Sequence, residues 1–143
     1  MRWTLPQPFA DLDHTADVGV AVEGDSAEEA LARLVLAEAA LLAGGGAVEA
    51  RAEVELASSG EDLAGCAVGL LRELLYRFAT ARELAASCEV LRLSATEAAV
   101  RVGLGRWDPG LHGEGADLKA VTWHAARFER DGARWRAQVV FDI

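Results

Sequence analysis

The sequence predicts one α+β domain in which two helices pack on an antiparallel β-sheet. Two segments carry apolar residues at helical spacing, whereas several others alternate apolar and polar residues as strands do. The 143 residues fall within the size range of a single domain, so we expect one domain spanning 1–143. The sequence has neither a glycine-rich phosphate loop nor a repeated strand-helix-strand unit. An antiparallel arrangement therefore explains the pattern better than a parallel one.

The first strand and helix follow one another directly. Residues 17–25 alternate valines with small or polar residues, which indicates a half-buried strand. Ser26 and Glu29 have the spacing of a capping box, in which the serine hydroxyl accepts from a free helix N–H and the glutamate reaches back. A helix should begin here and end at the glycines 44–46, because glycine tolerates a positive φ.

A second strand and helix come next. Residues 49–58 alternate again, which is typical of an antiparallel strand with one exposed face. Ser58 or Ser59 should cap a second helix, whose apolar stripe runs from Leu63 to Phe78. Because this stripe is wide, we expect the second helix to be the central one.

The second half of the chain reads as β structure interrupted by a loop. Residues 106–117 hold three glycines and a proline, so they should form an irregular loop. Asp131 and Gly132 predict a hairpin turn. The strands expected in this half lie at 89–95, 98–105, 118–130 and 135–143.

Composition and charge exclude several function classes. The chain is 52% hydrophobic and 26% charged, no apolar run approaches the roughly 18 residues of a membrane span, and no signal peptide is recognisable. We therefore expect a cytoplasmic protein that uses no membrane. The net charge of −9 argues against direct binding of RNA or DNA, so RNA should be reached only through a partner. Cys66 and Cys88 lie in no CxxC motif, which favours buried thiols.

The densest polar cluster precedes the first strand. It comprises Asp11, Asp13, His14 and Asp17. One interpretation is a turn, because Asp and Thr side chains accept hydrogen bonds from nearby backbone N–H groups. The other is a site for a hard cation such as Ca²⁺ or Mg²⁺, which prefers oxygen ligands. His14 alone indicates a structural histidine, since no second His or Cys has zinc spacing.

Catalysis by this chain alone has little support in the sequence. His112 and His124 would serve as bases and Asp108 and Glu114 as their partners, but no nucleophile motif accompanies them. Lys119 is the only lysine among 14 basic residues, a hint of a role that arginine would not fill.

The end of the chain carries two neighbouring carboxylates. Asp142 precedes Ile143, whose α-carboxylate is ionised at neutral pH. Alternation along the last strand places Asp142 on the face opposite Trp135 and Phe141. This ending is either an accident of length or part of a binding site.

Three stretches of the chain resemble the archease family: "LDHTADVGV" at 12–20, "LKAVTWH" at 118–124 and the terminal "FDI" at 141–143. The resemblance covers essentially the whole chain. Its departures are Val18, where isoleucine is common, and Trp123, where tyrosine is common. Neither of them replaces a carboxylate.

The resemblance implies a function that composition alone does not suggest. Archeases are protein cofactors of the GTP-dependent tRNA-splicing RNA ligase; they promote its guanylylation and its multiple turnover. The chain would then be a non-catalytic activator built from strand-helix-strand-strand modules. Its metal site would comprise Asp17, Asp142 and Ile143 and hold a divalent ion, with Ca²⁺ as first choice and Mg²⁺ or Mn²⁺ as alternatives. Residues that would support the site or contact the partner are Asp13, His14, Asp108, His112, Lys119 and His124.

Two other interpretations stay open. A standalone metal-dependent hydrolase of phosphate esters would use Asp17 and Asp142 to hold an activating cation. A general chaperone or assembly factor would use an exposed apolar face and not the carboxylates.

Overall fold

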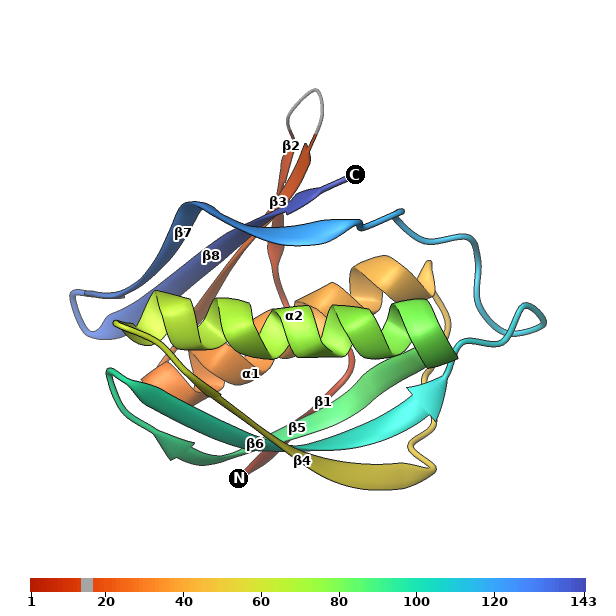
Figure 1. Ribbon diagram of the computed structural model, residues 1–143, viewed down its shortest axis with the longest axis horizontal. Helices are drawn as coiled ribbons and strands as arrows, with labels where there is room; N and C mark the ends of the chain where they lie inside the picture. The colour runs from red at the N-terminus through yellow and green to blue at the C-terminus, as the bar shows by residue number, and fades with distance from the viewer. Residues whose placement is uncertain (14–16) are drawn as a thin grey trace.

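The structure, a computed structural model, describes every residue except 14–16, and it leaves the side chains of Asp11 and Asp13 undescribed. Within the described part, two helices lie between two four-stranded sheets (Figure 1). The helices are α1 (Ala27–Ala43) and α2 (Leu63–Ala81). The strands are β1 (Arg2–Thr4), β2 (Ala10–Asp13), β3 (Asp17–Gly24), β4 (Ala52–Ser59), β5 (Glu83–Leu93), β6 (Glu97–Arg106), β7 (Ala120–Asp131) and β8 (Arg134–Asp142). This architecture confirms the α+β prediction.

Both sheets are antiparallel. One has the order β1-β5-β6-β4 and the other β2-β3-β8-β7. The sequence missed β1 and β2, which are short and show no clear alternation. It also placed the start of β5 six residues late, because Glu83 directly follows the last residues of α2. The hairpin turn at Asp131 and Gly132 is confirmed, with Gly132 at φ 63°.

Helix α1 begins and ends as the capping pattern predicts. The Ser26 hydroxyl accepts a hydrogen bond from the Glu29 N–H at 3.0 Å. The Glu29 carboxylate reaches back one residue further than a standard capping box and accepts from the Asp25 N–H at 2.8 Å. Gly44 ends the helix at φ 66°, a left-handed conformation that costs glycine little.

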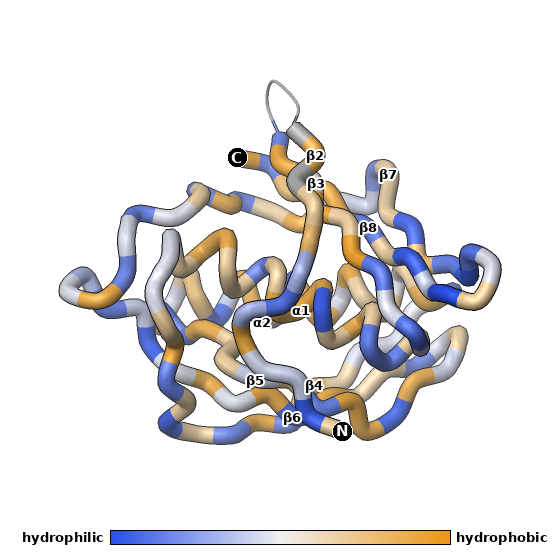
Figure 2. Tube along the Cα trace, turned by 180° about the vertical axis from the view of Figure 1, so that it is seen from behind, coloured by the Kyte–Doolittle hydropathy of each residue, from blue (hydrophilic) through white to orange (hydrophobic). Residues whose placement is uncertain are grey.

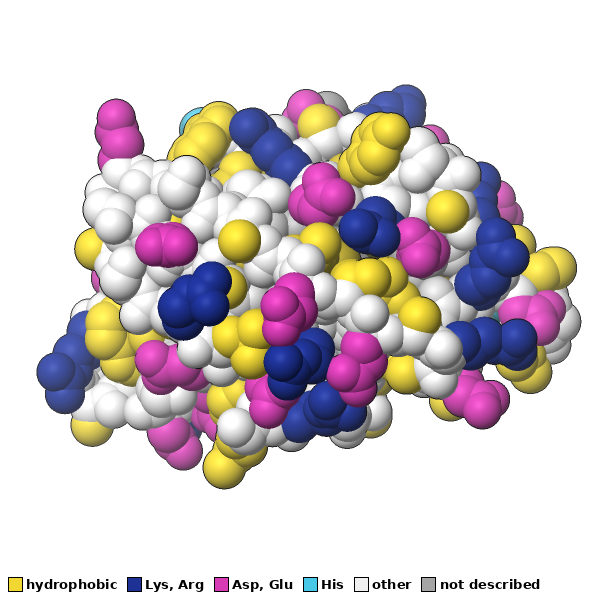
Figure 3. Space-filling view, turned by 60° about the horizontal axis from the view of Figure 1, so that its bottom comes forward, with side chains coloured by type: hydrophobic (Ala, Val, Ile, Leu, Met, Phe, Trp, Pro, Cys, Tyr) yellow, Lys and Arg dark blue, Asp and Glu magenta, His cyan; other side chains and the backbone are white. Residues whose placement is uncertain are grey.

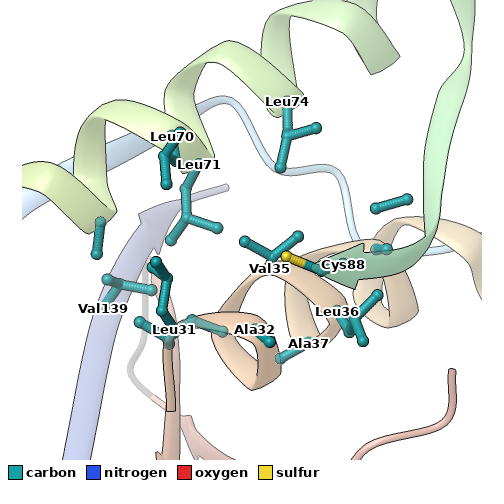
Figure 4. Packing of buried hydrophobic residues seen from close by; sticks show 14 of the residues in the cluster. Leu31, Ala32, Val35, Leu36, Ala37, Leu70, Leu71, Leu74, Cys88 and Val139 are labelled. Carbon is teal, nitrogen blue, oxygen red and sulfur yellow. The ribbon is translucent and has the colours of Figure 1, made fainter. Parts of the chain in front are cut away.

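Helix α1, and not α2, is the central helix, so the prediction on this point was wrong. Eleven of the 17 residues of α1 are buried, and it packs against β3 and β8 on one side and β5 on the other. Only eight of the 19 residues of α2 are buried, because one face meets solvent. Figure 4 shows Leu31 and Val35 of α1 beside Leu70 and Leu71 of α2. Apolar residues line both helices between the sheets (Figure 2).

The cap of α2 also differs from the prediction. Asp62 is the N-cap, and its side chain accepts from the Gly65 N–H at 2.8 Å. Ser58 and Ser59 instead end β4, and the Ser58 hydroxyl donates to the Cys66 carbonyl. Both serines are thus held by the sheet, which leaves the cap to the next suitable side chain.

The prediction of buried thiols is confirmed. Cys66 and Cys88 are both free and buried, and burial raises the pKa of the Cys88 thiol to about 12.

On the face shown in Figure 3, basic and acidic side chains lie interspersed. In the sheet of β4, β5 and β6, Arg101 binds both Glu55 and Glu89 at 2.9 Å. No helix in the described part of the chain is long and apolar enough to cross a membrane.

One polar group stands out in this core. Glu38 of α1 is 1% exposed, and its Oε2 has no hydrogen-bond partner among the described residues. Burial raises the pKa of its carboxyl well above the ordinary value of 4.5. The folded state therefore binds this proton more tightly than the unfolded chain does.

We expect Glu38 to make the protein less stable as pH rises. Its contribution is complete below the ordinary pKa of 4.5 and declines by about 1.4 kcal/mol per pH unit up to the folded-state pKa. Urea unfolding of the wild type and of Glu38→Gln from about pH 5 to about pH 8 measures this slope, which the variant should lose. Glu28→Gln, which changes an exposed acid on the same helix, is the control and should keep the slope. Equal slopes in all three proteins would contradict the assignment.

Candidate functional site

Asp17 and Asp142 face one another across β3 and β8. They are direct partners in the antiparallel register, followed along the same strands by Val18 with Phe141. Directly opposed residues project from the same face of a sheet, with Cβ atoms about 5 Å apart. Phe141 is fully buried against the helices, so Asp17 and Asp142 lie on the outer face. The structure therefore brings together the two side chains that were predicted from opposite ends of the chain.

The pair has the properties of a cation site. Asp17 Oδ1 is buried and has no hydrogen-bond partner among the described residues. Asp142 is exposed, and Ile143 beside it is 44% exposed. Opposed like charges destabilise a strand pair unless something compensates them. An orphaned carboxylate oxygen facing a second carboxylate fits a hard divalent cation, which prefers oxygen ligands.

Side chains alone do not complete a metal cage here. In the part of the chain that the structure describes, no group of three or more His, Cys, Asp or Glu side chains gathers in a way that would hold a metal ion. A set built on Asp17 and Asp142 thus needs a further donor. The α-carboxylate of Ile143 comes next to Asp142 along the chain.

The first residue of β7 and the residue before it lie beside Asp142. Ala120 is its direct partner, and the Lys119 N–H donates to the Asp142 carbonyl at 2.8 Å. Lys119 therefore lies next to the carboxylate pair, with an exposed side chain that forms no ion pair with any described residue.

Thr122 is a neighbour of the pair that the sequence did not single out as a site residue. It pairs with Val140 and so shares the outer face, diagonal to Asp142. Its Oγ1, like Asp17 Oδ1, is buried without a partner among the described residues. The sequence offered one signal for this position: Thr122 follows Ala120 by two residues, so the two residues share one face of the strand.

The β2–β3 hairpin lies at the same end of the sheet. The backbone of Asp13 pairs with that of Val18, one position from Asp17. Figure 1 shows the C-terminus beside this hairpin. The Asp13 side chain and His14 lie outside the described residues, so their predicted roles stay predictions.

Asp108 and His112 are not brought to this site. His112 is 6% exposed, and its Nδ1 accepts from the Asp108 N–H at 2.8 Å. Its Nε2 then donates to the Ala47 carbonyl at 2.9 Å, so both ring nitrogens are occupied. Asp108 Oδ1 accepts from the Gly110 N–H at 2.8 Å. These hydrogen bonds hold the 106–117 loop against the segment after α1. In this structure Asp108 and His112 therefore have a structural role.

His124 lies in a bulge of β7. The register with β8 is interrupted between Thr122 and Arg127, and the Gln138 side chain donates to the Ala125 carbonyl at 2.9 Å. His124 is exposed there. Trp123 is 56% exposed, with the Arg72 guanidinium 5.2 Å from its ring centroid. Bulges re-aim side chains, and this one directs two of them to solvent.

Comparison with known proteins identifies the family of this chain. Residues 9–143 match the model of the Archease protein family (MTH1598/TM1083). The chain belongs to the archease family. It is 32% identical to "Protein archease" of Methanopyrus kandleri over 95% of this chain and 99% of that one. It is also 32% identical to "Protein archease" of Pyrococcus furiosus, over 92% and 95% of the two chains.

Solved structures show the same archease fold. The solution structure of Methanobacterium thermoautotrophicum protein 1598 superposes with a TM-score of 0.71 at 24% identity, covering 94% of this chain and 98% of that one. The crystal structure of a Thermotoga maritima protein described as "an archease, possible chaperone" gives a TM-score of 0.60 at 24% identity, covering 97% and 98%. At this identity the structural likeness establishes the fold alone.

The carboxylate pair predicts cation-dependent stability. With saturating Ca²⁺, at about 100 times the dissociation constant, the wild type should gain about 2.7 kcal/mol in its free energy of unfolding relative to protein in chelator. Asp142→Asn should lose most of this gain, and in chelator it should be at least as stable as the wild type, because the like-charge contact is gone. Denaturant unfolding with and without Ca²⁺ measures both effects. Asp117→Asn, at an exposed position, is the matched control. Equal gains in the wild type and Asp142→Asn would exclude Asp142 as a ligand.

Proposed function

We propose that this archease is a metal-binding accessory protein that activates the GTP-dependent tRNA-splicing RNA ligase. It promotes guanylylation of the ligase and allows multiple turnover in RNA end joining, in the cytoplasm. Family membership over residues 9–143 supports the assignment. RNA is reached only through the ligase, in keeping with the net charge of −9.

The observation that carries the proposal is the opposition of Asp17 and Asp142, with Asp17 Oδ1 buried and unpartnered among the described residues. These two side chains and the α-carboxylate of Ile143 would hold the ion, with Ca²⁺ first and Mg²⁺ or Mn²⁺ as alternatives. When bound, the cation supplies positive charge that offsets the repulsion between the carboxylates. The chain's own contribution is to fix two carboxylates at one exposed end of a sheet.

The surroundings of the pair suit contact with a protein partner. Lys119 is tied to Asp142 through the backbone, and its side chain is free to reach outward. The exposed Trp123, stacked on Arg72, lies further along the same strand. Trp and Arg are the residue types that most often dominate protein interfaces. We assign Lys119, Trp123 and Arg72 to ligase contact and assign no catalytic residue to this chain.

The alternatives make different demands. The Thermotoga maritima relative is described as a possible chaperone. A general chaperone would use exposed apolar surface and would not depend on Asp142. A standalone hydrolase would process phosphate esters without the ligase. Incubating the protein alone with RNA termini or nucleotides and Mg²⁺ tests the hydrolase, because turnover without ligase would favour it.

We expect Asp142→Asn to impair ligase activation. At saturating protein concentration, the variant should stimulate formation of guanylylated ligase at least about tenfold less than the wild type, by analogy with losses at metal sites. Labelled GTP and a fixed amount of ligase measure the effect in single and multiple turnovers. Asp117→Asn should stimulate normally. Full stimulation by Asp142→Asn would refute the role of this carboxylate and favour the chaperone alternative.

A one-residue extension isolates the terminal carboxylate. Adding glycine after Ile143 moves the α-carboxylate about 3.5 Å along the chain without altering any side chain. We expect Ca²⁺ affinity to fall about tenfold while the stability in chelator stays unchanged. Calorimetric titration measures the affinity, and a glycine added before Met1 is the control. Unchanged affinity would remove Ile143 from the proposed ligand set and leave the two aspartates.

A further inference from the structure

A pocket lies away from the carboxylate pair, where the 106–117 loop leaves β6. It has a volume of about 560 Å³. Figure 1 shows this loop at the end of the molecule where α2 stops, well separated from the C-terminus. Three arginines line the pocket, Arg51, Arg82 and Arg106, together with Trp107. The volume falls within the range of pockets that bind small molecules.

Backbone contacts from three segments build this cluster. The Arg51 N–H donates to the Leu104 carbonyl at 2.7 Å, which joins the segment before β4 to β6. The Trp107 N–H donates to the Arg82 carbonyl at 2.8 Å, which joins the end of β6 to the C-cap of α2. The His112 contact with Ala47 then fixes the loop over the same segment. The arginines are therefore held together by the fold and not by chance proximity on mobile loops.

The side chains of the three arginines are not engaged in ion pairs. Among the described residues none of them forms an ion pair, although arginines elsewhere do, as Arg101 does with Glu55 and Glu89. Arg106 donates to the Ala81 carbonyl at 3.4 Å. Its cross-strand partner Glu83 is bound instead by Arg77 at 3.4 Å. In a chain of net charge −9, three unpaired arginines around one pocket form a local positive site.

The acidic groups near the pocket do not cancel this charge. Glu49 and Asp108 line it. Asp108 Oδ1 already accepts from the Gly110 N–H. Glu49 is exposed and makes no ion pair with a described residue. Three guanidinium groups thus share the pocket with two carboxylates, which leaves an excess of one positive charge.

Arg82 carries a second, independent signal. It ends α2 at φ 55°, a left-handed position where glycine is the usual residue and a side chain is strained. Its guanidinium stacks on the Phe78 ring at 4.9 Å, which orients it and leaves its N–H edge for other contacts. Non-glycine residues in strained backbone positions cluster at functional sites.

We propose that this arginine pocket binds the phosphate groups of a nucleotide. Guanidinium groups donate paired hydrogen bonds that match phosphate oxygens, and three of them suit a polyphosphate. The indole N–H of Trp107 is already bound to the Gly113 carbonyl at 3.2 Å, so only its ring is offered to a ligand. An acidic protein segment is the competing ligand, because carboxylates also accept paired hydrogen bonds from guanidinium groups. A terminal phosphate carries up to two negative charges and a carboxylate only one, so the phosphate suits a cluster of three arginines better.

The test is binding of defined probes to the full-length protein. Tripolyphosphate, GTP, ATP and a short RNA with or without a terminal phosphate are titrated calorimetrically, and a glutamate-rich peptide is the competing probe. We expect saturable, salt-sensitive binding of at least one phosphate probe, weakened about tenfold by Arg51→Gln, Arg82→Gly or Arg106→Gln. Arg82→Gly is the sharpest variant, because glycine suits the left-handed position and the fold should be kept. Arg92→Gln, an exposed arginine elsewhere on β5, is the matched control.

Each outcome decides the proposal. Tightest binding of GTP, ATP or tripolyphosphate supports the proposal. Tightest binding of the phosphorylated RNA end would overturn it and would contradict the view that RNA is reached only through the ligase. The proposal is overturned if no phosphate probe binds, if only the acidic peptide binds, or if Arg92→Gln weakens binding as much as Arg82→Gly. Thermal unfolding of each variant shows whether any loss comes from a disrupted fold.

Discussion

The antiparallel pairing of β3 with β8 is the contact on which the rest of the molecule depends. It joins a strand near the start of the chain to the last one, from Asp17 with Asp142 to Gly24 with Trp135. On the inner face it places Val20 and Val139 over α1, both almost fully buried. On the outer face the same register opposes the two aspartates. A slip of one residue would send each side chain to the other face and would lose both the core and the site.

The helical layer imposes the second constraint. Because α1 lies between two sheets, nearly every side of it must be apolar, and its alanines and leucines meet this demand. Glu38 is the exception, a carboxyl with no described partner for Oε2 in the middle of the core. Burying a charge there is costly, so burial raises the pKa of this carboxyl and favours its neutral form. The core thus contains one acidic residue, but burial disfavours a charge on it.

Acidic and basic side chains are distributed differently in three parts of the molecule. On the sheet of β4, β5 and β6, opposite charges neutralise one another in networks such as that of Arg101. At the β3–β8 end two carboxylates oppose one another across a strand pair, and at the 106–117 loop three arginines outnumber the two acidic residues that line the same pocket. The net charge of −9 averages over both places. It describes the long-range field of the molecule and not the ligand chemistry of either end.

The sequence by itself determined the elements whose cause is local. The cap at Ser26, the stop at Gly44 and the turn at Gly132 follow from side chains and φ preferences within a few residues. The pattern also fixed which face of β8 carries Asp142, since alternation along a strand needs no partner. The family could be named from three short stretches, and with it the likeness of Asp17 and Asp142 to a ligand pair.

Only the tertiary structure decided the rest, because each remaining feature joins residues distant along the chain. It made α1 and not α2 the central helix, since burial depends on which layers cover a helix and not on its own stripe. It placed Asp108 and His112 away from Asp142, because both ring nitrogens of His112 form hydrogen bonds that hold the 106–117 loop. It placed Thr122 beside the carboxylate pair and gathered Arg51, Arg82 and Arg106 around one pocket. Such meetings are set by strand register and backbone contacts, which no local pattern encodes.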